Sequence, residues 1–166
     1  MVNEYNCDPW LVPRRCSDSW FENSVASGLG WALGAAIGIK LAAPSQTVVV
    51  TVGDGSYLFN TPLSAHMAAR QEDLAMLIVV FNDQAWSTIK KSTKGSHPTG
   101  HAARTGKFAL CDFSVEIAYD QIAAACGFIG IRAETPAELP ARIDEALKAV
   151  RAGNMVLLNV ICERDG

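Results

Sequence analysis

Two uninterrupted apolar runs constrain the fold of this chain more than any other feature. Residues 47–52 have the sequence Thr-Val-Val-Val-Thr-Val, and residues 76–81 have the sequence Met-Leu-Ile-Val-Val-Phe. Strands that are apolar throughout, rather than alternating apolar with polar, are typical of a parallel sheet that is covered on both faces. The sequence therefore predicts an α/β fold built on buried parallel strands.

The segments around these two strands have the features of helices and further strands. Pro44 ends an Ala- and Gly-rich helix, Pro62 lies in the first turn of another, and Thr135 is expected to be an N-cap with Glu138 three residues later. The expected helices cover residues 30–43, 61–71, 113–126 and 136–151, the further strands cover 128–133 and 155–161, and residues 84–110 form a short helix and a long loop. This alternation predicts a parallel sheet with helices on both faces.

The length of 166 residues fits one domain of ordinary size. Residues 1–27 contain Pro9 and Pro13 and have no clear periodicity, so we expect an irregular lead-in segment there. The remaining residues, 28–166, are expected to form the domain itself.

Charge and composition exclude several classes of partner. The net charge is -3 and no block of five like charges occurs, which argues against nucleic acid or an anionic membrane as the main partner. The most apolar stretch, residues 28–43, is interrupted by Lys40 and is too short to span a bilayer. The five cysteines are scattered without a C-x-x-C pair, which argues against a disulfide framework or a zinc site. With no signal peptide visible at the N-terminus, a cytoplasmic protein is expected.

Acidic residues follow both apolar strands. Residues 53–56, Gly-Asp-Gly-Ser, come after the first strand, and Asn82 and Asp83 come after the second. Two carboxylates at adjoining strand ends repel each other unless a cation lies between them, and Mg²⁺ prefers oxygen ligands completed by phosphate. The glycines beside Asp54 would let a bulky anion approach the backbone, and Ser56 would open the next helix. The residues alone leave two interpretations open, a Mg²⁺–diphosphate site or an ordinary Gly/Asp turn followed by a helix start.

These residues resemble the thiamin diphosphate motif, which runs from Gly-Asp-Gly to a pair usually written Asn-Asn. Here the motif is Gly-Asp-Gly-Ser-Tyr-Leu-Phe-Asn at 53–60 and Val-Val-Phe-Asn-Asp-Gln-Ala-Trp-Ser at 79–87. A third segment, Ala-Ser-Gly-Leu-Gly-Trp-Ala-Leu-Gly at 26–34, is similar to one in acetolactate synthase-like and benzoylformate decarboxylase-like enzymes. The chain thus resembles the diphosphate-binding domain of the thiamin diphosphate enzymes over nearly its whole length.

The resemblance implies a set of ligands for Mg²⁺. The carboxylate of Asp54, the side chain of Asp83 and the backbone carbonyl of Ala85 would bind the metal, with Asn82 as a minor alternative. Relatives usually have Asn where this chain has Asp83. The extra negative charge beside a diphosphate is expected to weaken cofactor affinity.

The resemblance also implies how the cofactor lies. Leu29 aligns with the bulky residue that wedges beneath thiamin diphosphate and forces its V shape, although an ordinary core leucine is the alternative from composition alone. The backbone carbonyl of Ser27 would accept a hydrogen bond from the aminopyrimidine, and Trp86 and Ser87 take places often held by Tyr and Gly. The implied cofactor-binding set is Ser27, Gly28, Leu29, Gly53, Asp54, Gly55, Ser56, Asp83, Ala85, Trp86 and Ser87.

The three histidines are not part of this motif. His66 lies within an expected helix and is expected to be structural or exposed. His97 and His101 lie in the loop after the motif, where a substrate contact and a solvated loop are both open, and the solvated loop is favoured.

A catalytic glutamate is missing from the motif. In relatives it comes from a separate pyrimidine-binding domain, and no glutamate of this chain stands in the matching context. The chain is therefore expected to be a subunit of a split enzyme or a piece lacking an N-terminal region. Either would work in a homo- or hetero-oligomer, and we expect the isolated chain to be inactive.

The implied reaction is decarboxylation or carboligation of a small 2-oxo acid, with acetolactate synthase-like enzymes as the nearest resemblance. One alternative is a subunit of a split sulfopyruvate- or phosphonopyruvate-type decarboxylase. Another is a non-catalytic binding or assembly module of the same fold. A dinucleotide-binding domain is disfavoured because no G-x-G-x-x-G comes after the first strand.

Overall fold

The protein is described from a computed structural model, which covers residues 1–4, 7–14, 17–22 and 28–164. Within these residues six strands form one sheet in the order β2-β1-β3-β4-β6-β5, and every neighbouring pair is parallel. The strands are β1 (Val2–Glu4), β2 (Phe21–Glu22), β3 (Val48–Gly53), β4 (Met76–Asn82), β5 (Ile129–Ala133) and β6 (Val156–Ile161). The predicted α/β fold with a parallel sheet is confirmed.

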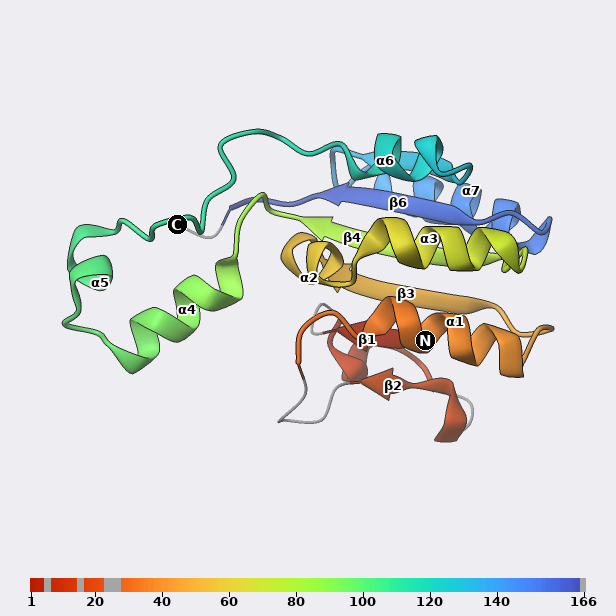
Figure 1. The fold of residues 1–166 in the computed structure, drawn as a ribbon, viewed down its shortest axis with the longest axis horizontal. Helices are drawn as coiled ribbons and strands as arrows, with labels where there is room; N and C mark the ends of the chain where they lie inside the picture. Colours follow the sequence, from red (N-terminus) through yellow and green to blue (C-terminus); the bar gives the residue numbers. More distant parts are fainter. Residues whose placement is uncertain (5–6, 15–16, 23–27, 165–166) are drawn as a thin grey trace.

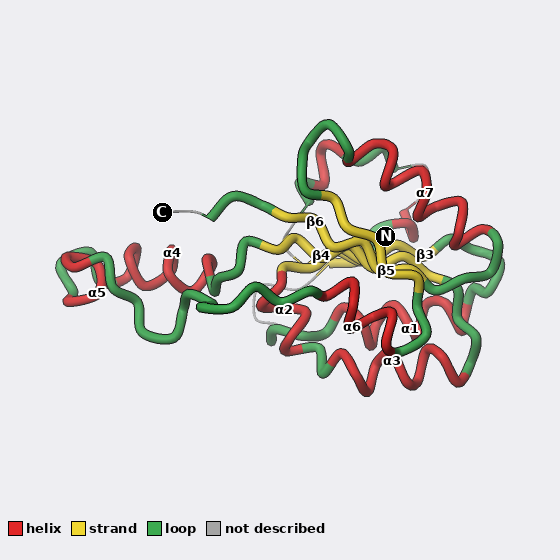
Figure 2. Tube along the Cα trace, turned by 90° about the horizontal axis from the view of Figure 1, so that it is seen from above, coloured by secondary structure: helices red, strands yellow, loops and turns green. Residues whose placement is uncertain are grey.

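Helices cover both faces of the sheet, as Figure 2 shows. One face carries α1 (Ala32–Ala42), α2 (Asp54–Phe59), α3 (Pro62–Gln71) and α6 (Tyr119–Ala125), and the other carries α7 (Leu139–Arg151). Each face has its own hydrophobic cluster. The larger one includes Leu33, Tyr57 and Tyr119, and the smaller one, under α7, includes Leu158 and Ala146.

Two short helices extend beyond the carboxyl end of the sheet, away from the other helices (Figure 1). They are α4 (Ser87–Ser96) and α5 (His101–Thr105). The base of α4 is fixed by an ion pair of 2.8 Å between Lys90 Nζ and Asp112 Oδ1. This part of the chain therefore begins next to the strand ends and leads away from the sheet.

The N-terminal residues contribute to the sheet, which the sequence pattern did not predict. Residues 1–27 were expected to be irregular, but β1 lies between β2 and β3, and Val2 is fully buried there. The side chain of Asn3 accepts a hydrogen bond of 2.7 Å from Thr51 Oγ1 on β3. A three-residue strand has no periodicity to detect, so only its partner strand reveals it. The boundary after residue 27 stays a prediction.

Two helix boundaries also differ from the expectation. Helix α6 begins at Tyr119 rather than at residue 113, because the preceding residues are engaged with the end of β4: the Phe113 amide donates to Gln84 O. Helix α7 begins at Leu139, and Thr135 donates to the Glu138 side chain in a turn before the helix instead of capping it. Both errors arise because long-range or turn contacts replace helical hydrogen bonds.

None of the helices in the described residues is long and apolar enough to cross a membrane.

Candidate functional site

The carboxyl ends of the central strands surround a cavity of about 410 Å³. This is the edge where ligands bind in open parallel sheets. The described residues that line it are Glu4, Leu29, Gly53, Asp54, Gly55, Ser56, Phe81, Asp83, Ala85, Trp86, Ser87, Thr88, Ile89, Cys162 and Glu163. The structure thus brings together nine of the eleven residues of the predicted cofactor-binding set.

The two other predicted residues lie apart from this lining. Gly28 is exposed and does not line the cavity, and Ser27 lies outside the described residues. Leu29 does line the cavity, with 41% of its surface exposed. An exposed leucine on a cavity wall is not an ordinary core residue, which disfavours that alternative.

Asp54 is a buried carboxylate with an unused oxygen. It follows β3 as the first residue of α2 and is only 2% exposed. Its Oδ1 accepts a hydrogen bond of 2.7 Å from the Gly55 amide, but no hydrogen-bond donor among the described residues reaches its buried Oδ2. Burial, and then the charge of Asp83, raise its pKa to about 6, against the opposing effect of backbone N–H groups. A cation at this point would remove both penalties.

Asp83 lies at the end of the neighbouring strand, in a tight turn. Its Oδ1 accepts a hydrogen bond of 3.2 Å from the Ala85 amide. Gln84 between them has a φ of 57°, a left-handed conformation that is uncommon for a residue with a side chain. A bridge between Ala85 and Asp112 holds the far side of the turn. The turn therefore keeps the carboxylate of Asp83 and the backbone of Ala85 together at the cavity.

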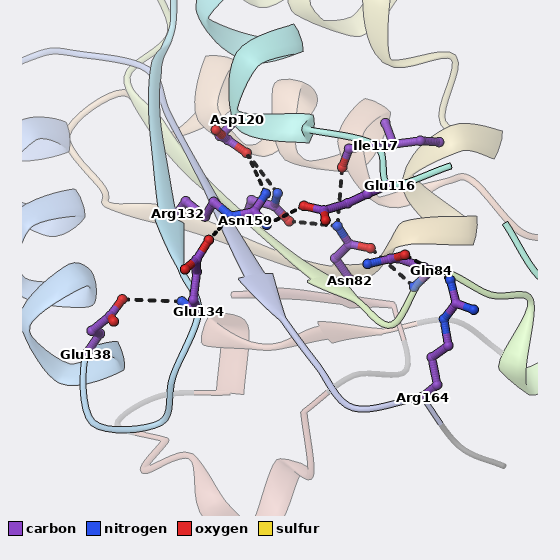
Figure 3. Close-up of polar contacts among 10 residues, drawn as sticks. All are labelled: Asn82, Gln84, Glu116, Ile117, Asp120, Arg132, Glu134, Glu138, Asn159 and Arg164. Atoms are coloured by element: carbon purple, nitrogen blue, oxygen red, sulfur yellow. Dashed lines mark hydrogen bonds and ion pairs between the residues drawn. The ribbon is translucent and has the colours of Figure 1, made fainter. Parts of the chain in front are cut away.

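Asn82 does not line the cavity, and its amide belongs to a polar network shown in Figure 3. Its Nδ2 donates to Asn159 Oδ1 at 3.2 Å and to Ile117 O at 3.3 Å, and its Oδ1 accepts from the Gln84 amide at 3.2 Å. Asn159 in turn donates to Asp120 Oδ1 at 2.8 Å. Because both ends of the Asn82 amide are occupied, the geometry favours Asp83 over Asn82 as a metal ligand.

Arg132 completes this network at the surface. Its guanidinium contacts Glu116 and Glu134, and lies 4.0 Å from Asp120 Oδ1. The hydrogen bonds thus extend from Asp120, through Asn159 and Asn82, to the amide of Gln84, and Arg132 adds an ion pair at the outer end. They hold the end of β4 next to the residues that line the cavity.

Gly55 and the aromatic residues form one wall of the cavity. The ring of Trp86 packs edge-to-face against Phe59 at 5.3 Å and Phe113 at 5.7 Å, between ring centroids. Gly55 lies directly against this ring. Ser87 follows, and its buried Oγ has no hydrogen-bond partner among the described residues. A buried hydroxyl without a partner is uncommon and suits a polar ligand at this wall.

Charge in the cavity is unbalanced. Of the described residues that line it, four carry carboxylates, Glu4, Asp54, Asp83 and Glu163, and none carries a basic side chain. Such a lining cannot hold a diphosphate by itself, because like charges repel strongly at low dielectric. Among the described residues, no group of three His, Cys, Asp or Glu side chains could hold a metal ion. Two carboxylates with phosphate oxygens are, however, a usual environment for Mg²⁺. The residues present therefore fit a Mg²⁺–diphosphate pair better than either ion alone.

Six residues of the lining were not predicted from the sequence. Cys162 and Glu163 follow the end of β6, so the rule that ligands lie beyond strand ends could have found them. Glu4 could not be found, because its strand was not predicted. Phe81, Thr88 and Ile89 flank predicted residues and add wall surface.

The histidines lie outside the cavity. His66 is buried on α3, and its Nε2 lies 2.6 Å from Tyr57 Oη. His97 and His101 are exposed around α4 and α5. The expectation of a structural or exposed His66 agrees with its burial. The other two are exposed, as expected, although His101 begins α5 instead of lying in a loop.

The family of the chain is established by comparison with known proteins. Residues 10–160 match the model of the thiamine pyrophosphate enzyme C-terminal TPP-binding domain. The chain belongs to this family. The matched residues include both strand ends that carry Asp54 and Asp83.

Several characterised proteins are similar to this TPP-binding domain. It is 31% identical over 152 residues to the large subunit of acetolactate synthase isozyme 3 from Escherichia coli, covering 92% of this chain and 24% of that protein. It is 29% identical over 137 residues to sulfoacetaldehyde acetyltransferase from Rhodobacter capsulatus, covering 82% of this chain and 22% of that protein. The chain thus spans about a quarter of the length of the curated relatives it matches.

Solved structures share the fold. Benzoylformate decarboxylase from Polynucleobacter necessarius superposes with a TM-score of 0.75 at 20% identity, covering 99% of this chain and 30% of that one. The thiamine diphosphate-dependent 4-hydroxybenzoylformate decarboxylase from Rhodococcus jostii gives a TM-score of 0.72 at 24% identity, covering 89% of this chain and 25% of that one.

Proposed function

We propose that this TPP-binding domain holds Mg²⁺ and the diphosphate of thiamin diphosphate in an enzyme that decarboxylates or ligates a small 2-oxo acid. The observation that carries the proposal is the buried Asp54 carboxylate, whose free Oδ2 shares the cavity with Asp83. A buried carboxylate with an unpaired oxygen beside a second carboxylate is costly unless a cation binds there.

Each residue has a defined task in this proposal. Asp54, Asp83 and the Ala85 carbonyl bind Mg²⁺, and Gly55 and Ser87 lie along the diphosphate, with Gly53, Ser56 and Trp86 completing the wall. Leu29 supports the organic part of the cofactor. Bound thiamin diphosphate would supply the electron sink that the decarboxylation of a 2-oxo acid requires. The chain's own residues bind and orient it.

The proposal includes a partner. The catalytic glutamate is expected to come from a pyrimidine-binding domain, on another chain or in an N-terminal region, within a homo- or hetero-oligomer. Two observations support this: the chain spans about a quarter of its relatives, 24% of the acetolactate synthase subunit, and the cavity is lined in part by the exposed Leu29 and Ile89. Apolar side chains exposed at a site are typical of surfaces that a second domain covers.

The reaction class is inferred from the relatives. Acetolactate synthase and sulfoacetaldehyde acetyltransferase are activities named for two of the similar proteins. We therefore assign the chain to an acetolactate synthase-like decarboxylase or carboligase.

Calorimetric titration of thiamin diphosphate into the chain, with and without Mg²⁺, tests the site. Binding is expected only with Mg²⁺, and it should be lost in Asp54→Ala. Asp144→Ala, at an exposed position of α7, is the matched control and should bind like the wild type. Mg²⁺-independent binding, or full binding by Asp54→Ala, would rule out this site.

A further inference from the structure

Glu4 is a buried acidic residue at the cavity that the proposed function does not use. It is the last residue of β1 and is 0% exposed, and together with Leu29 it is part of the cavity lining. An acidic side chain is rarely buried in full unless its oxygens are paired. The contacts of its two oxygens therefore indicate what it does.

Both oxygens accept hydrogen bonds from the start of α1. Oε1 accepts from the Gly30 amide at 2.6 Å, and Oε2 accepts from the Ala32 amide at 3.2 Å. These N–H groups lie 26 and 28 residues along the chain from Glu4. With both oxygens engaged by backbone donors, Glu4 acts on the protein rather than as an acid or base.

Asn60 completes the contact from the end of α2. Its Nδ2 donates to Glu4 Oε2 at 3.2 Å and to Ser56 O at 2.7 Å, while its Oδ1 accepts from the Leu33 amide at 2.8 Å. Asn60 is 5% exposed. The pair therefore joins β1, α1 and the helix that begins with Asp54.

Helix α1 depends on these two residues for its N-terminal donors. Trp31 occupies the N-cap position and makes no side-chain hydrogen bond to the helix. The first N–H groups of a helix need acceptors, and a carboxylate near them also interacts favourably with the helix dipole. Here the cap is supplied from elsewhere in the chain.

The bend at residues 28–30, which carries Leu29, is held between two contacts. Gly30 has a φ of 87°, and a Cβ atom there would lie 2.5 Å from Phe59 O. The bend therefore packs against the end of α2 on one side. On the other, the Glu4 carboxylate holds the Gly30 amide.

We propose that Glu4 is the positioning residue for Leu29. Its buried carboxylate fixes the bend at residues 28–30, and so fixes where Leu29 stands in the cavity. Because Glu4 binds the Gly30 amide directly but reaches the helix of Asp54 only through Asn60, Glu4 controls affinity for the organic part of the cofactor more than for its diphosphate. This inference rests on the proposed function, since it takes thiamin diphosphate as the ligand.

Glu4→Gln tests the inference with little change of volume. Glutamine keeps one acceptor oxygen but turns an amide NH₂ toward a backbone donor, so one of the two backbone contacts is lost. The 166-residue chain is titrated, in Mg²⁺, with thiamin diphosphate and separately with inorganic diphosphate, and NMR measures both dissociation constants. Glu72→Gln, on the exposed end of α3, is the control for loss of a negative charge.

The wild type is expected to bind thiamin diphosphate more tightly than diphosphate. Glu4→Gln should weaken thiamin diphosphate binding about tenfold and change diphosphate binding less than about twofold. Glu72→Gln should change neither. If Glu4→Gln loses affinity for both ligands equally, or loses affinity for neither, the proposed role of Glu4 is wrong.

A second measurement uses the wild type alone and so does not depend on the variant folding. Hydrogen exchange at the amides of Gly30 and Ala32 should slow more with thiamin diphosphate than with diphosphate. Equal protection by the two ligands would overturn the proposal. The variant Asp54→Ala separates the two hypotheses. If Asp54→Ala still binds diphosphate, the proposed site is contradicted. If Asp54→Ala loses diphosphate binding while Glu4→Gln binds both ligands like the wild type, only the role of Glu4 is contradicted.

Discussion

Gly55 and Trp86 are in such close contact that residue 55 has no room for a side chain. A Cβ atom there would lie 2.6 Å from Cε3 of the Trp86 ring. The ring cannot turn aside easily, because Phe59 and Phe113 pack against it edge-to-face. The glycine of the motif is thus required by the aromatic residue at the neighbouring strand end, as well as by any ligand.

Gly55→Ala should accordingly lower both stability and cofactor binding. The forced shift of Trp86 is expected to cost about 1–3 kcal/mol of unfolding free energy, measured by urea denaturation. Binding of Mg²⁺–thiamin diphosphate should fall at least tenfold, since the wall beside the diphosphate moves. Gly34→Ala is the control, because nothing lies within 4 Å of a Cβ at that helical position. It should be neutral or stabilising.

A double variant identifies the cause. If the indole ring is the obstacle, Gly55→Ala should cost much less stability in a Trp86→Leu background than in the wild type. Additive effects of the two substitutions would show that the ring is not responsible.

Asp83→Asn should strengthen cofactor binding. The described lining contains four carboxylates and no basic side chain, so removing one negative charge reduces repulsion of the diphosphate. Asparagine can still accept the hydrogen bond from the Ala85 amide through its Oδ1. Calorimetry should show about three- to tenfold tighter binding of thiamin diphosphate at saturating Mg²⁺.

The control for this change is Asp73→Asn, which removes a carboxylate from an exposed residue before β4. Asp73 has a φ of 49°, a conformation that asparagine also adopts readily, so the backbone should not be disturbed. Asp73→Asn should not change the affinity for thiamin diphosphate. Weaker binding by Asp83→Asn would mean that the second carboxylate is needed to hold the metal.

The sequence was sufficient to predict the central sheet and the two acidic strand ends. The strands over residues 47–52 and 76–81 are long and apolar, so their burial is evident from composition, and parallel pairing then places Asp54 near Asp83. Each acidic residue comes directly after its strand in the sequence. Position at the carboxyl edge is therefore enough to predict that the two carboxylates lie close together, whereas the choice between a metal site and an ordinary turn stayed open on the residues alone.

Glu4 and Asn60 could not be predicted, for a physical reason. The contacts that join them to each other and to the start of α1 link residues 26 to 56 positions apart, and they depend on a strand of three residues that has no pattern of its own. Residues 113–118 were wrongly predicted to be helical for the same reason, because their backbone groups bind residues at the end of β4 instead of forming a helix. Polar contacts between distant segments leave no periodicity in either segment.

Asn159 should be important for the end of β4, although it does not line the cavity. It has no exposed surface and links Asn82 to Asp120. Asn159→Ala leaves Asp120 Oδ1 without its amide donor and Asn82 with a weaker set of contacts. Loss of about 2–3 kcal/mol of unfolding free energy is expected. Mg²⁺-dependent cofactor binding should weaken too, because Asn82 holds the Gln84 amide.

Asn154→Ala is the matched control. Asn154 is exposed, and its amide donates to Ala149 O at 3.1 Å at the end of α7. Asn154→Ala should lower the unfolding free energy by much less than Asn159→Ala does. Similar losses for the two variants would mean that the buried network adds nothing beyond a single surface hydrogen bond.

His66 should make the domain sensitive to mild acid. It is 1% exposed, its Nε2 lies 2.6 Å from Tyr57 Oη, and burial lowers its pKa from 6.5 to about 4. Since the unfolded chain binds this proton more readily, stability is fully present above pH 6.5 and falls as the pH is lowered toward 4. The difference in pKa corresponds to a loss of at most about 3 kcal/mol.

Urea denaturation of the wild type and His66→Gln at pH 7 and pH 4.5 measures this contribution. Glutamine stays neutral at both values and can still bond to the Tyr57 hydroxyl. The variant is therefore expected to be less stable than the wild type at pH 7, because packing is disturbed, but to lose less stability on acidification. His97→Gln, at an exposed position, should keep the full pH dependence of the wild type. If His66→Gln and His97→Gln lose equal stability between the two pH values, the acid sensitivity comes from carboxylates whose pKa is lowered by folding, such as Asp112 beside Lys90, and not from the buried imidazole.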